Sequence, residues 1–161
     1  MTGFECKLDS DIEEFIRTKA IPYEKAHKCR TYLFLGSDFF RVPRPMIIAY
    51  LSIALSNTKL NPDVSNTMKK RMDGIFKNDE APCYLIGQIA KNDRYPGEID
   101  GRDLIECAIK IIRIGHKAVG GRFIRVDIKN NEKLIRFYEE NGFNRFTASA
   151  RADLIPLVRF L

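Results

Sequence analysis

The sequence predicts a mixed α/β domain in which at least part of the sheet is parallel. Runs typical of strands alternate with helical patterns along the chain, and a strand that follows a strand and a helix lies parallel to the first strand in a shared sheet. The chain has 161 residues, of which 45% are hydrophobic and 30% are charged. One globular domain commonly has this size and composition. We therefore expect residues 1–161 to form a single domain around one core.

The N-terminal half begins with a predicted helix and continues with two strands. Ser10 and Glu13 form a capping-box pattern, and apolar residues then recur at helical spacing until Pro22 interrupts them. Two runs rich in β-branched and aromatic residues predict strands at 31–35 and 47–55.

The middle of the chain predicts two helices with a strand between them. Residues 61–76 open with Pro62, a residue that suits the first helical turn, and predict an exposed helix. Residues 83–90 have the pattern of a buried strand. A turn-rich stretch leads from this strand to a helical pattern that starts at Gly101 and ends among Gly115, Gly120 and Gly121.

The C-terminal part predicts a strand, a helix and a final strand. The strand covers residues 123–128, and the helix covers 131–141 and is closed by Gly142. Residues 154–161 form the last β-rich run. The predicted order of elements is therefore α-β-β-α-β-α-β-α-β.

Composition excludes several classes of protein. The chain does not begin with a basic segment followed by an apolar one, and its apolar runs are shorter than the roughly 18 residues of a membrane span, so we expect a cytoplasmic protein without membrane contacts. The net charge of +6 fits either an anionic partner or an ordinary solvated surface. With two histidines and no C-x-x-C pair, no metal site is predicted. The scattered cysteines are expected to be free, partly buried thiols: Cys6, Cys29, Cys83 and Cys107.

Two sequence blocks resemble the GNAT N-acetyltransferases. The first, Arg94-Tyr95-Pro96-Gly97-Glu98-Ile99, is similar to the acetyl-CoA-binding segment of that family, which has Arg or Gln, two residues, Gly, one residue, then Gly or Ala. Ile99 takes the place of the final small residue, and Gly101 follows two positions later. The second block, residues 131–143, resembles the late helix of the family through its Phe-Tyr pair and terminal Gly-Phe.

The N-terminal half resembles the GNAT toxins that acetylate aminoacyl-tRNA. This likeness rests on Phe4-Glu5-Cys6, on the helix through Phe15 and Ala20, on Arg30-Thr31-Tyr32 and on Ala49-Tyr50-Leu51-Ser52. The resemblance implies the GNAT fold, an α/β (α+β) arrangement with a mixed, mostly antiparallel central sheet that is splayed between its central parallel strands and has helices on both faces.

The resemblance also implies acetyl-CoA as the co-substrate. A glycine-containing loop that runs into a helix supplies backbone N–H donors for a pyrophosphate, and the end of the preceding strand can bond the pantetheine amides. An ordinary strand–turn–helix connection would have the same glycine pattern. The expected cofactor-binding residues are Ile89, Ala90, Lys91, Arg94, Tyr95, Pro96, Gly97, Glu98, Ile99, Asp100, Gly101, Arg102 and Asn131.

Tyr138 is the expected catalytic residue. Direct attack by an amine needs an acid to protonate the departing thiolate, and a phenol with a pKa of about 10 is protonated at neutral pH. The alternative is a purely structural tyrosine, because Leu134, Ile135 and Tyr138 share one helical face. No residue stands out as a general base. An α-amine, with a pKa of about 8, would need little help from one.

Three functions remain open at this point. The first is a toxin that acetylates the α-amine of aminoacyl-tRNA, with an antitoxin as a further partner. The second is an acetyltransferase for a small amine or a protein N-terminus, and the third is a CoA-binding regulatory domain that lacks catalysis. A homodimer is compatible with each of them. The residues that would contact tRNA phosphates are basic: Arg41, Arg44, Lys69, Lys70 and Arg71.

Overall fold

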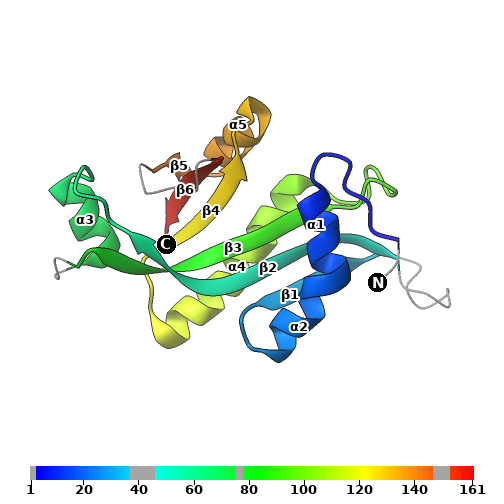
Figure 1. Cartoon of the computed structure of the whole chain (residues 1–161), viewed down its shortest axis with the longest axis horizontal. Coiled ribbons are helices and arrows are strands. Elements are labelled where there is room, and N and C mark those ends of the chain that lie inside the picture. Colours follow the sequence, from blue (N-terminus) through cyan, green and yellow to red (C-terminus); the bar gives the residue numbers. More distant parts are fainter. Residues whose placement is uncertain (1–2, 37–45, 75–77, 147–152) are drawn as a thin grey trace. The chain divides into compact units, whose positions relative to one another are not determined.

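The computed structural model describes residues 3–36, 46–74, 78–146 and 153–161, which form a six-stranded sheet with helices around it (Figure 1). The strands are β1 (Arg30–Leu35), β2 (Ile47–Lys59), β3 (Glu80–Lys91), β4 (Phe123–Lys129), β5 (Asn144–Arg145) and β6 (Leu154–Phe160). The helices are α1 (Ser10–Glu14), the π-helical η1 (Phe15–Lys19), α2 (Ala20–Lys25), α3 (Asn66–Asp73), α4 (Gly101–Val119) and α5 (Glu132–Glu140).

The sheet is mixed. Its hydrogen-bonded neighbours follow the order β1-β2-β3-β4-β6-β5. The pairs β1/β2, β4/β6 and β5/β6 are antiparallel. Strands β3 and β4 are parallel and are joined through α4, because parallel neighbours need a crossover connection. The predicted fold class, a mixed and mostly antiparallel α/β sheet, is confirmed.

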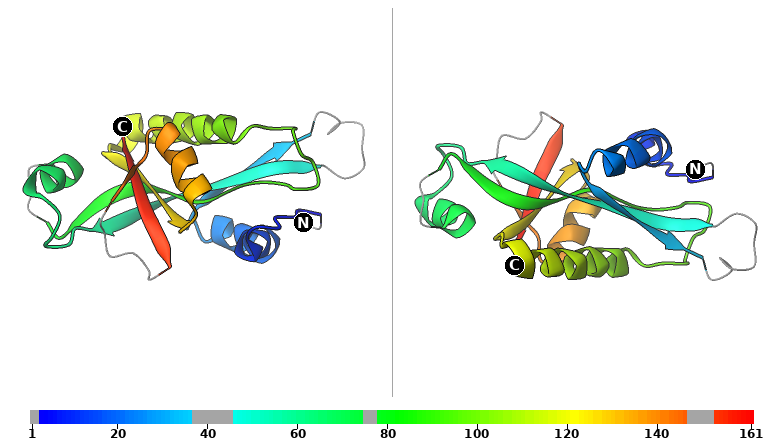
Figure 2. Two further views of the ribbon diagram at one scale, coloured as in Figure 1. Left: turned by 90° about the horizontal axis from the view of Figure 1, so that it is seen from above. Right: turned by 90° about the horizontal axis from the view of Figure 1, so that it is seen from below.

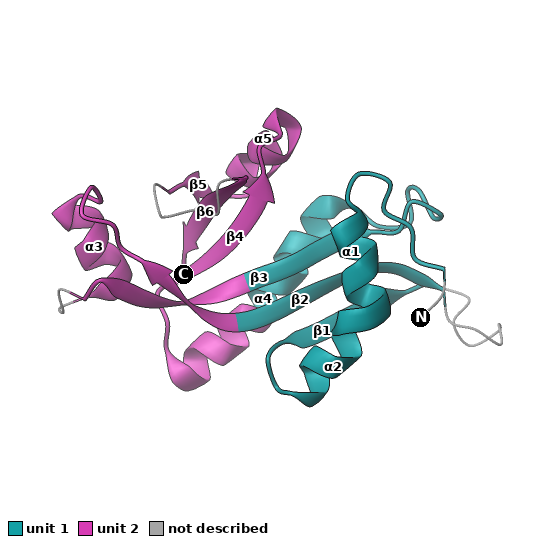
Figure 3. Ribbon diagram, viewed as in Figure 1, with its two compact units in different colours: residues 1–54, 86–110 teal, residues 55–85, 111–161 magenta. Residues whose placement is uncertain are grey.

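The chain divides into two compact units (Figure 3). Unit 1 comprises residues 1–54 and 86–110, and unit 2 comprises residues 55–85 and 111–161. The boundaries fall inside β2, β3 and α4, so each of these elements contributes residues to both units. The single domain expected from the sequence stays a prediction.

In unit 1 the N-terminal helices pack against β2 through aromatic side chains. The Phe15 and Tyr50 rings are stacked with centroids 6.2 Å apart, and the Tyr50 hydroxyl donates to the carbonyl oxygen of Ile12 at 2.8 Å. Figure 2 shows these helices on one face of β1 to β3 and the first half of α4 on the opposite face. The buried cluster consists of Phe4, Phe15, Ile16, Ala20, Cys29, Tyr50 and Ala90.

The start of the first helix differs from the prediction by one residue. The side chain of Asp9 accepts from the backbone N–H of Asp11 at 3.0 Å, so Asp9 is the N-cap and Ser10 is already helical. The Glu13 carboxylate reaches back and accepts from the N–H of Cys6 at 2.7 Å. The predicted capping box of Ser10 and Glu13 therefore does not form, and Glu13 instead ties the helix to the segment that precedes its N-cap.

The predicted end of this helix at Pro22 was wrong. Helical structure continues to Lys25, because the π-helical turn η1 is followed by a new α-helical segment, α2. Pro22 is the third residue of α2 and follows the π-helical turn directly, where the N–H of Ala20 bonds the Phe15 carbonyl five residues back, so the regular i→i−4 pattern is already interrupted ahead of the proline.

In unit 2 the core lies between α3 and strands β3, β4 and β6. Phe123 of β4 is fully buried, and its ring lies 6.1 Å from that of Phe160. Beside this core, Arg125 Nε donates to Asp127 Oδ1 at 2.7 Å, which pairs these two charged side chains of β4. The buried cluster consists of Leu60, Val64, Met72, Ala81, Cys83, Phe123, Phe146 and Val158.

Helix α3 is shorter than predicted. Its N-cap is Ser65, whose hydroxyl accepts from the N–H of Met68 at 3.2 Å, so the helix does not begin at Pro62. A serine hydroxyl satisfies a free N–H group, whereas proline offers only a favourable φ. The predicted helical residues 75 and 76 lie outside the described residues. The predicted long helix was correct in its start and passes through Gly115 to Val119.

Membrane spans and cysteines can be checked over the described residues. No helix in this part of the chain is both long enough and apolar enough to cross a bilayer. The four cysteines are free, with Cys29 and Cys83 buried and Cys6 and Cys107 partly buried, as predicted.

Candidate functional site

The residues predicted to bind the cofactor fall into both units. Residues 89–91 and 94–102 belong to unit 1, whereas Asn131 and Tyr138 belong to unit 2 (Figure 3). Strand β3 ends at Lys91, and the loop of residues 92–100 leads to α4. The first group therefore comprises the end of a strand, one loop and the first turn of a long helix.

Gly97 gives this loop its shape. Its φ of +84° lies in the left-handed region, which glycine adopts without strain. A Cβ built at Gly97 would have no atom within 4 Å, so the space beside it is open. Glycine is needed here for the backbone conformation, and the open space leaves room for a ligand to approach the backbone.

The start of α4 departs from the family pattern. Asp100 Oδ1 accepts from the N–H of Arg102 at 3.4 Å, and the Asp100 carbonyl accepts from the N–H of Leu104 at 3.3 Å. Asp100 thus caps the helix and places a carboxylate at its N-terminus. Gly101 is the first residue of α4, so the small residue expected at position 99 stands at the helix start instead.

Arg94, the first residue of the glycine motif, is paired with the N-terminal segment. Glu5 Oε1 accepts from Arg94 Nε at 2.7 Å and lies 2.6 Å from Arg94 Nη2. Both side chains are about half exposed, at 51% for Arg94 and 40% for Glu5, so the pair contributes at most about 1 kcal/mol to stability. Its consequence is geometric, because it fixes the direction of the guanidinium.

Asn92 is a buried residue at the start of the loop that the sequence reasoning missed. Its residue exposure is 2%. Nδ2 donates to the carbonyl oxygens of Gly3 at 3.1 Å and Ile47 at 2.8 Å. Oδ1 accepts from the N–H groups of Glu5 and Arg94, both at 3.1 Å. The one available signal was an amide residue two positions after a predicted buried strand.

Asn131 caps α5. Its Oδ1 accepts from the N–H of Lys133 at 2.9 Å and from the N–H of Leu134 at 3.3 Å. Among the described residues, Nδ2 of this exposed side chain has no hydrogen-bond partner. The cap leaves the amide donors of Asn131 available to a ligand.

Tyr138 is buried on α5, at 4% exposure. Its ring makes edge-on contacts with Phe137 at 5.3 Å and Phe143 at 5.4 Å between centroids. Burial raises the pKa of the Tyr138 hydroxyl above its usual range, so the phenol is protonated at neutral pH. No described residue forms a hydrogen bond with this hydroxyl. Leu134, which was expected on the same buried face, is 39% exposed, whereas Ile135 is 1% exposed.

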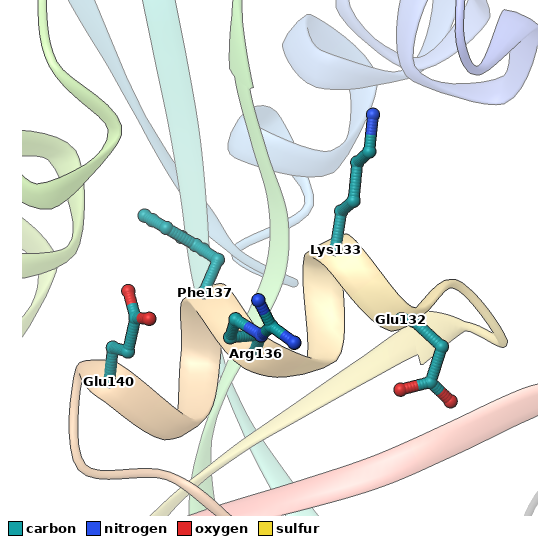
Figure 4. A pocket seen from close by; sticks show the side chains of 5 residues that line it. All are labelled: Glu132, Lys133, Arg136, Phe137 and Glu140. Carbon is teal, nitrogen blue, oxygen red and sulfur yellow. The ribbon is translucent and has the colours of Figure 1, made fainter.

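A shallow depression of about 270 Å³ lies along the outer side of α5 (Figure 4). This volume is below the range of about 300–1,000 Å³ that is usual for small-molecule sites. Figure 4 shows Lys133 and Phe137 projecting from successive turns of the helix. The depression is lined by Glu132, Lys133, Arg136, Phe137 and Glu140.

The predicted basic surface is partly described. Lys70 and Arg71 of α3 are exposed, and Lys69 is half-buried. The Arg71 guanidinium lies 3.7 Å from the centre of the Phe160 ring, which anchors it on the protein. Arg122 adds a cation beside Gly74, immediately after α3. The other two predicted contacts, Arg41 and Arg44, lie outside the described residues.

Comparisons with solved structures give strong matches along nearly the whole chain. A tyrosine-to-phenylalanine mutant of KacT matches with a TM-score of 0.76 at 20% identity, over 99% of this chain and 86% of that one. AtaT complexed with acetyl-methionyl-tRNAfMet matches with a TM-score of 0.72 at 19% identity, over 98% and 84%. The chain has the GNAT fold.

A third structure extends the comparison. A mutant AtaT toxin bound to the C-terminus of the antitoxin AtaR and to acetyl-CoA matches the GNAT fold of this chain with a TM-score of 0.70 at 17% identity, over 98% of this chain and 82% of that one. The matches include the N-terminal half, so the fold expected from both halves of the sequence is confirmed. A comparison with protein-family models finds no match, and neither does a comparison with curated protein sequences.

Proposed function

We propose that the chain is an acetyltransferase that transfers an acetyl group from acetyl-CoA to a primary amine. The observation that carries this proposal is the GNAT fold shared with AtaT, which has been seen with acetyl-CoA and with an acetylated aminoacyl-tRNA. Support from the chain itself comes from a glycine loop that opens a long helix and from a buried phenol without a hydrogen-bond partner among the described residues.

The loop of residues 92–100 fits a pyrophosphate in three respects. Gly97 exposes its backbone beside open space, α4 presents the positive end of a 19-residue helix, and Arg94 and Arg102 supply cations. The carboxylates of Glu98 and Asp100 oppose an anion. In this proposal Glu98 points away from the bound phosphates, and a phosphate displaces the Asp100 carboxylate from its long, 3.4 Å bond to the N–H of Arg102. The last residues of β3, Ile89 to Lys91, bond the pantetheine through their backbone.

Acetyl-CoA supplies the acetyl thioester when it is bound. The acceptor nitrogen forms a bond to the acetyl carbon, the carbon–sulfur bond breaks, and the amine proton leaves to water. The Tyr138 hydroxyl gives its proton to the sulfur and regains one from solvent. Because burial raises the pKa of this hydroxyl, it holds its proton at neutral pH and is available to donate it to the sulfur as negative charge develops there.

We further propose that the acceptor is the α-amine of an aminoacyl-tRNA. The pKa of an α-amine, about 8, leaves a useful neutral fraction at physiological pH, which agrees with the lack of an evident general base. The exposed cations of α3 would contact tRNA phosphates. An antitoxin, such as the one bound to AtaT, and a second copy of the chain are the further partners we propose, and the cytosol is the proposed location.

One observation favours a second candidate function. The carboxylate that caps α4 competes for the place where a pyrophosphate would bind. A domain that binds CoA weakly for regulation, without transfer, would tolerate this arrangement. An acetyltransferase for a small amine or a protein N-terminus differs from the main proposal only in its acceptor.

The test combines binding with transfer. Millimolar acetyl-CoA is expected to raise the melting temperature, since a ligand that binds only the native state stabilises it. Thiol release is then measured with charged tRNA, a polyamine and an N-terminal peptide offered in parallel. No thermal shift contradicts the cofactor, and a shift without transfer to any acceptor supports the regulatory domain.

Salt and two matched variants then test the acceptor. Transfer to charged tRNA is expected to weaken steeply with salt, and the Lys69→Gln/Lys70→Gln variant should reduce this salt dependence. The Lys110→Gln/Lys117→Gln variant is the control. It removes two exposed lysines of α4, so its net charge changes by the same amount, and it should retain the salt dependence of transfer. Transfer only to the polyamine or the peptide, without salt dependence, contradicts the tRNA proposal.

A further inference from the structure

The loop between β3 and α4 is held by hydrogen bonds to the N-terminal segment, residues 3–7. The N–H of Asp93 donates to the carbonyl oxygen of Glu5 at 2.9 Å, and the N–H of Lys7 donates to Asp93 Oδ2 at 2.7 Å. The Asn92 amide adds bonds to Gly3 and Glu5. The first residues of the loop are thus attached to a segment that lies almost ninety positions earlier in the chain.

Asn92 is the centre of these attachments. A side-chain amide has two donor hydrogens and accepts through two lone pairs, and all four positions of Asn92 are used. Its four partners are backbone groups of the N-terminal segment, β2 and the loop. Since unsatisfied polar groups are costly at a buried position, these bonds select one path for the backbone from Asn92 to Arg94.

Arg94 is held at both of its ends. Its backbone N–H is bound by Asn92, its Nε–H donates to Glu5 Oε1, and Nη2 lies 2.6 Å from the same oxygen. A guanidinium has five N–H donors, so most of them remain for an anion. The arrangement orients the residue and leaves it able to bind phosphate.

We propose that Asn92 is a positioning residue for the pyrophosphate of acetyl-CoA and that residues 3–7 are part of the cofactor site. This inference rests on the proposed acetyltransferase function. Asn92 acts through Arg94 and the loop and does not touch the cofactor. A loop that is ordered before the ligand arrives loses less entropy on binding, so the network strengthens cofactor binding and leaves the transfer step unchanged.

The principal test measures acetyl-CoA binding by calorimetry in the wild type, Asn92→Ala and Tyr50→Phe. Tyr50→Phe is the matched control, because it also removes a buried hydrogen bond in unit 1, and that bond goes to Ile12 of α1. The dissociation constant is expected to rise roughly tenfold in Asn92→Ala and to stay within about twofold in Tyr50→Phe. With any acceptor that supports turnover, KM for acetyl-CoA should rise in Asn92→Ala while kcat and KM for the acceptor stay unchanged.

A second variant covers the case in which Asn92→Ala does not fold. Asp93→Ala removes an exposed acceptor of the Lys7 N–H and leaves the core intact. It should raise the dissociation constant by roughly threefold, in the same direction. Hydrogen exchange gives a readout without cofactor, because release of the segment should speed exchange at the Glu5 amide in both variants.

The outcomes separate the two proposals. If the wild type fails to bind acetyl-CoA, the proposed function is wrong. If the wild type binds and folded Asn92→Ala binds equally well, the positioning role of Asn92 is wrong. If only Asp93→Ala folds, faster exchange at Glu5 with unchanged affinity overturns the inference, and weaker binding supports it.

Discussion

The two connections that lead from a strand into a helix differ in what holds them. After β4, the chain enters α5 through two residues, and Asn131 caps the helix through the N–H groups of Lys133 and Leu134. After β3, residues 92–100 precede α4, and bonds to Gly3 and Ile47, which are 89 and 45 positions away from Asn92, hold the start of this loop. A local cap can be recognised from its own residues, whereas a loop held from a distance cannot.

This difference separates the effects expected from substitutions. The α5 residues proposed to act in acetyl transfer lie on a regular helix with a local cap. A substitution there is therefore expected to alter the proton donor or the stability of the helix. In the loop, the residues that would bind phosphate depend on other segments, so a change there alters cofactor affinity. Three predictions test this separation.

The largest effect is expected from Tyr138→Phe. The ring contacts with Phe137 and Phe143 remain while the proton is lost, so transfer should fall by roughly 10²-fold with acetyl-CoA affinity and melting temperature little changed. Tyr84→Phe, which removes the bond from a phenol to the Gly120 carbonyl in the same unit, is the control and should retain its rate.

The pH profile of the wild type adds a second check on the acid. Because burial raises the pKa of Tyr138, the rate should not fall between about pH 7 and pH 9 through loss of this proton. Full activity of Tyr138→Phe with every acceptor would remove the proposed acid and leave Tyr138 as a core residue.

The next effect concerns the glycine in the loop. Gly97 and Gly120 have φ values of +84° and +79°, and neither has an atom within 4 Å of an added Cβ. Alanine should therefore destabilise both positions by a similar amount, about 1–2 kcal/mol. Gly97→Ala should also weaken acetyl-CoA binding by roughly tenfold, because it crowds the backbone offered to phosphate. Equal affinity in both variants, measured by calorimetry, would place the pyrophosphate elsewhere.

The smallest effect is expected from the two side-chain caps. Asn131→Ala and Ser65→Ala each remove an N-cap, from α5 and α3 respectively, and each should lower the free energy of unfolding by about 1 kcal/mol. Asn131→Ala should also weaken acetyl-CoA binding by roughly threefold, since it removes the free Nδ2 donor. If both variants bind acetyl-CoA like the wild type, Asn131 has only its capping role.

The sequence predicted the regular elements better than their ends. Strands β1 and β4 and helix α5 were placed within a residue or two, and helix α4 was correct at its start, because hydrophobic period and local caps indicate them directly. Pro22 and Pro62 each led to a wrong helix boundary. The helical run continues past Pro22 after a π-helical turn, and α3 begins after the Ser65 cap instead of at Pro62.

The sequence by itself determined the alternation of strands and helices, the cap of α5 and the glycine that bends the loop before α4. Each of these depends on interactions among residues that are close in the chain. The tertiary structure decided that Asn92 is fully bonded, that Arg94 pairs with Glu5 and that Tyr138 is buried with its proton retained. These features depend on which distant segments become neighbours, and periodicity within one segment carries no information about the partner it meets after folding.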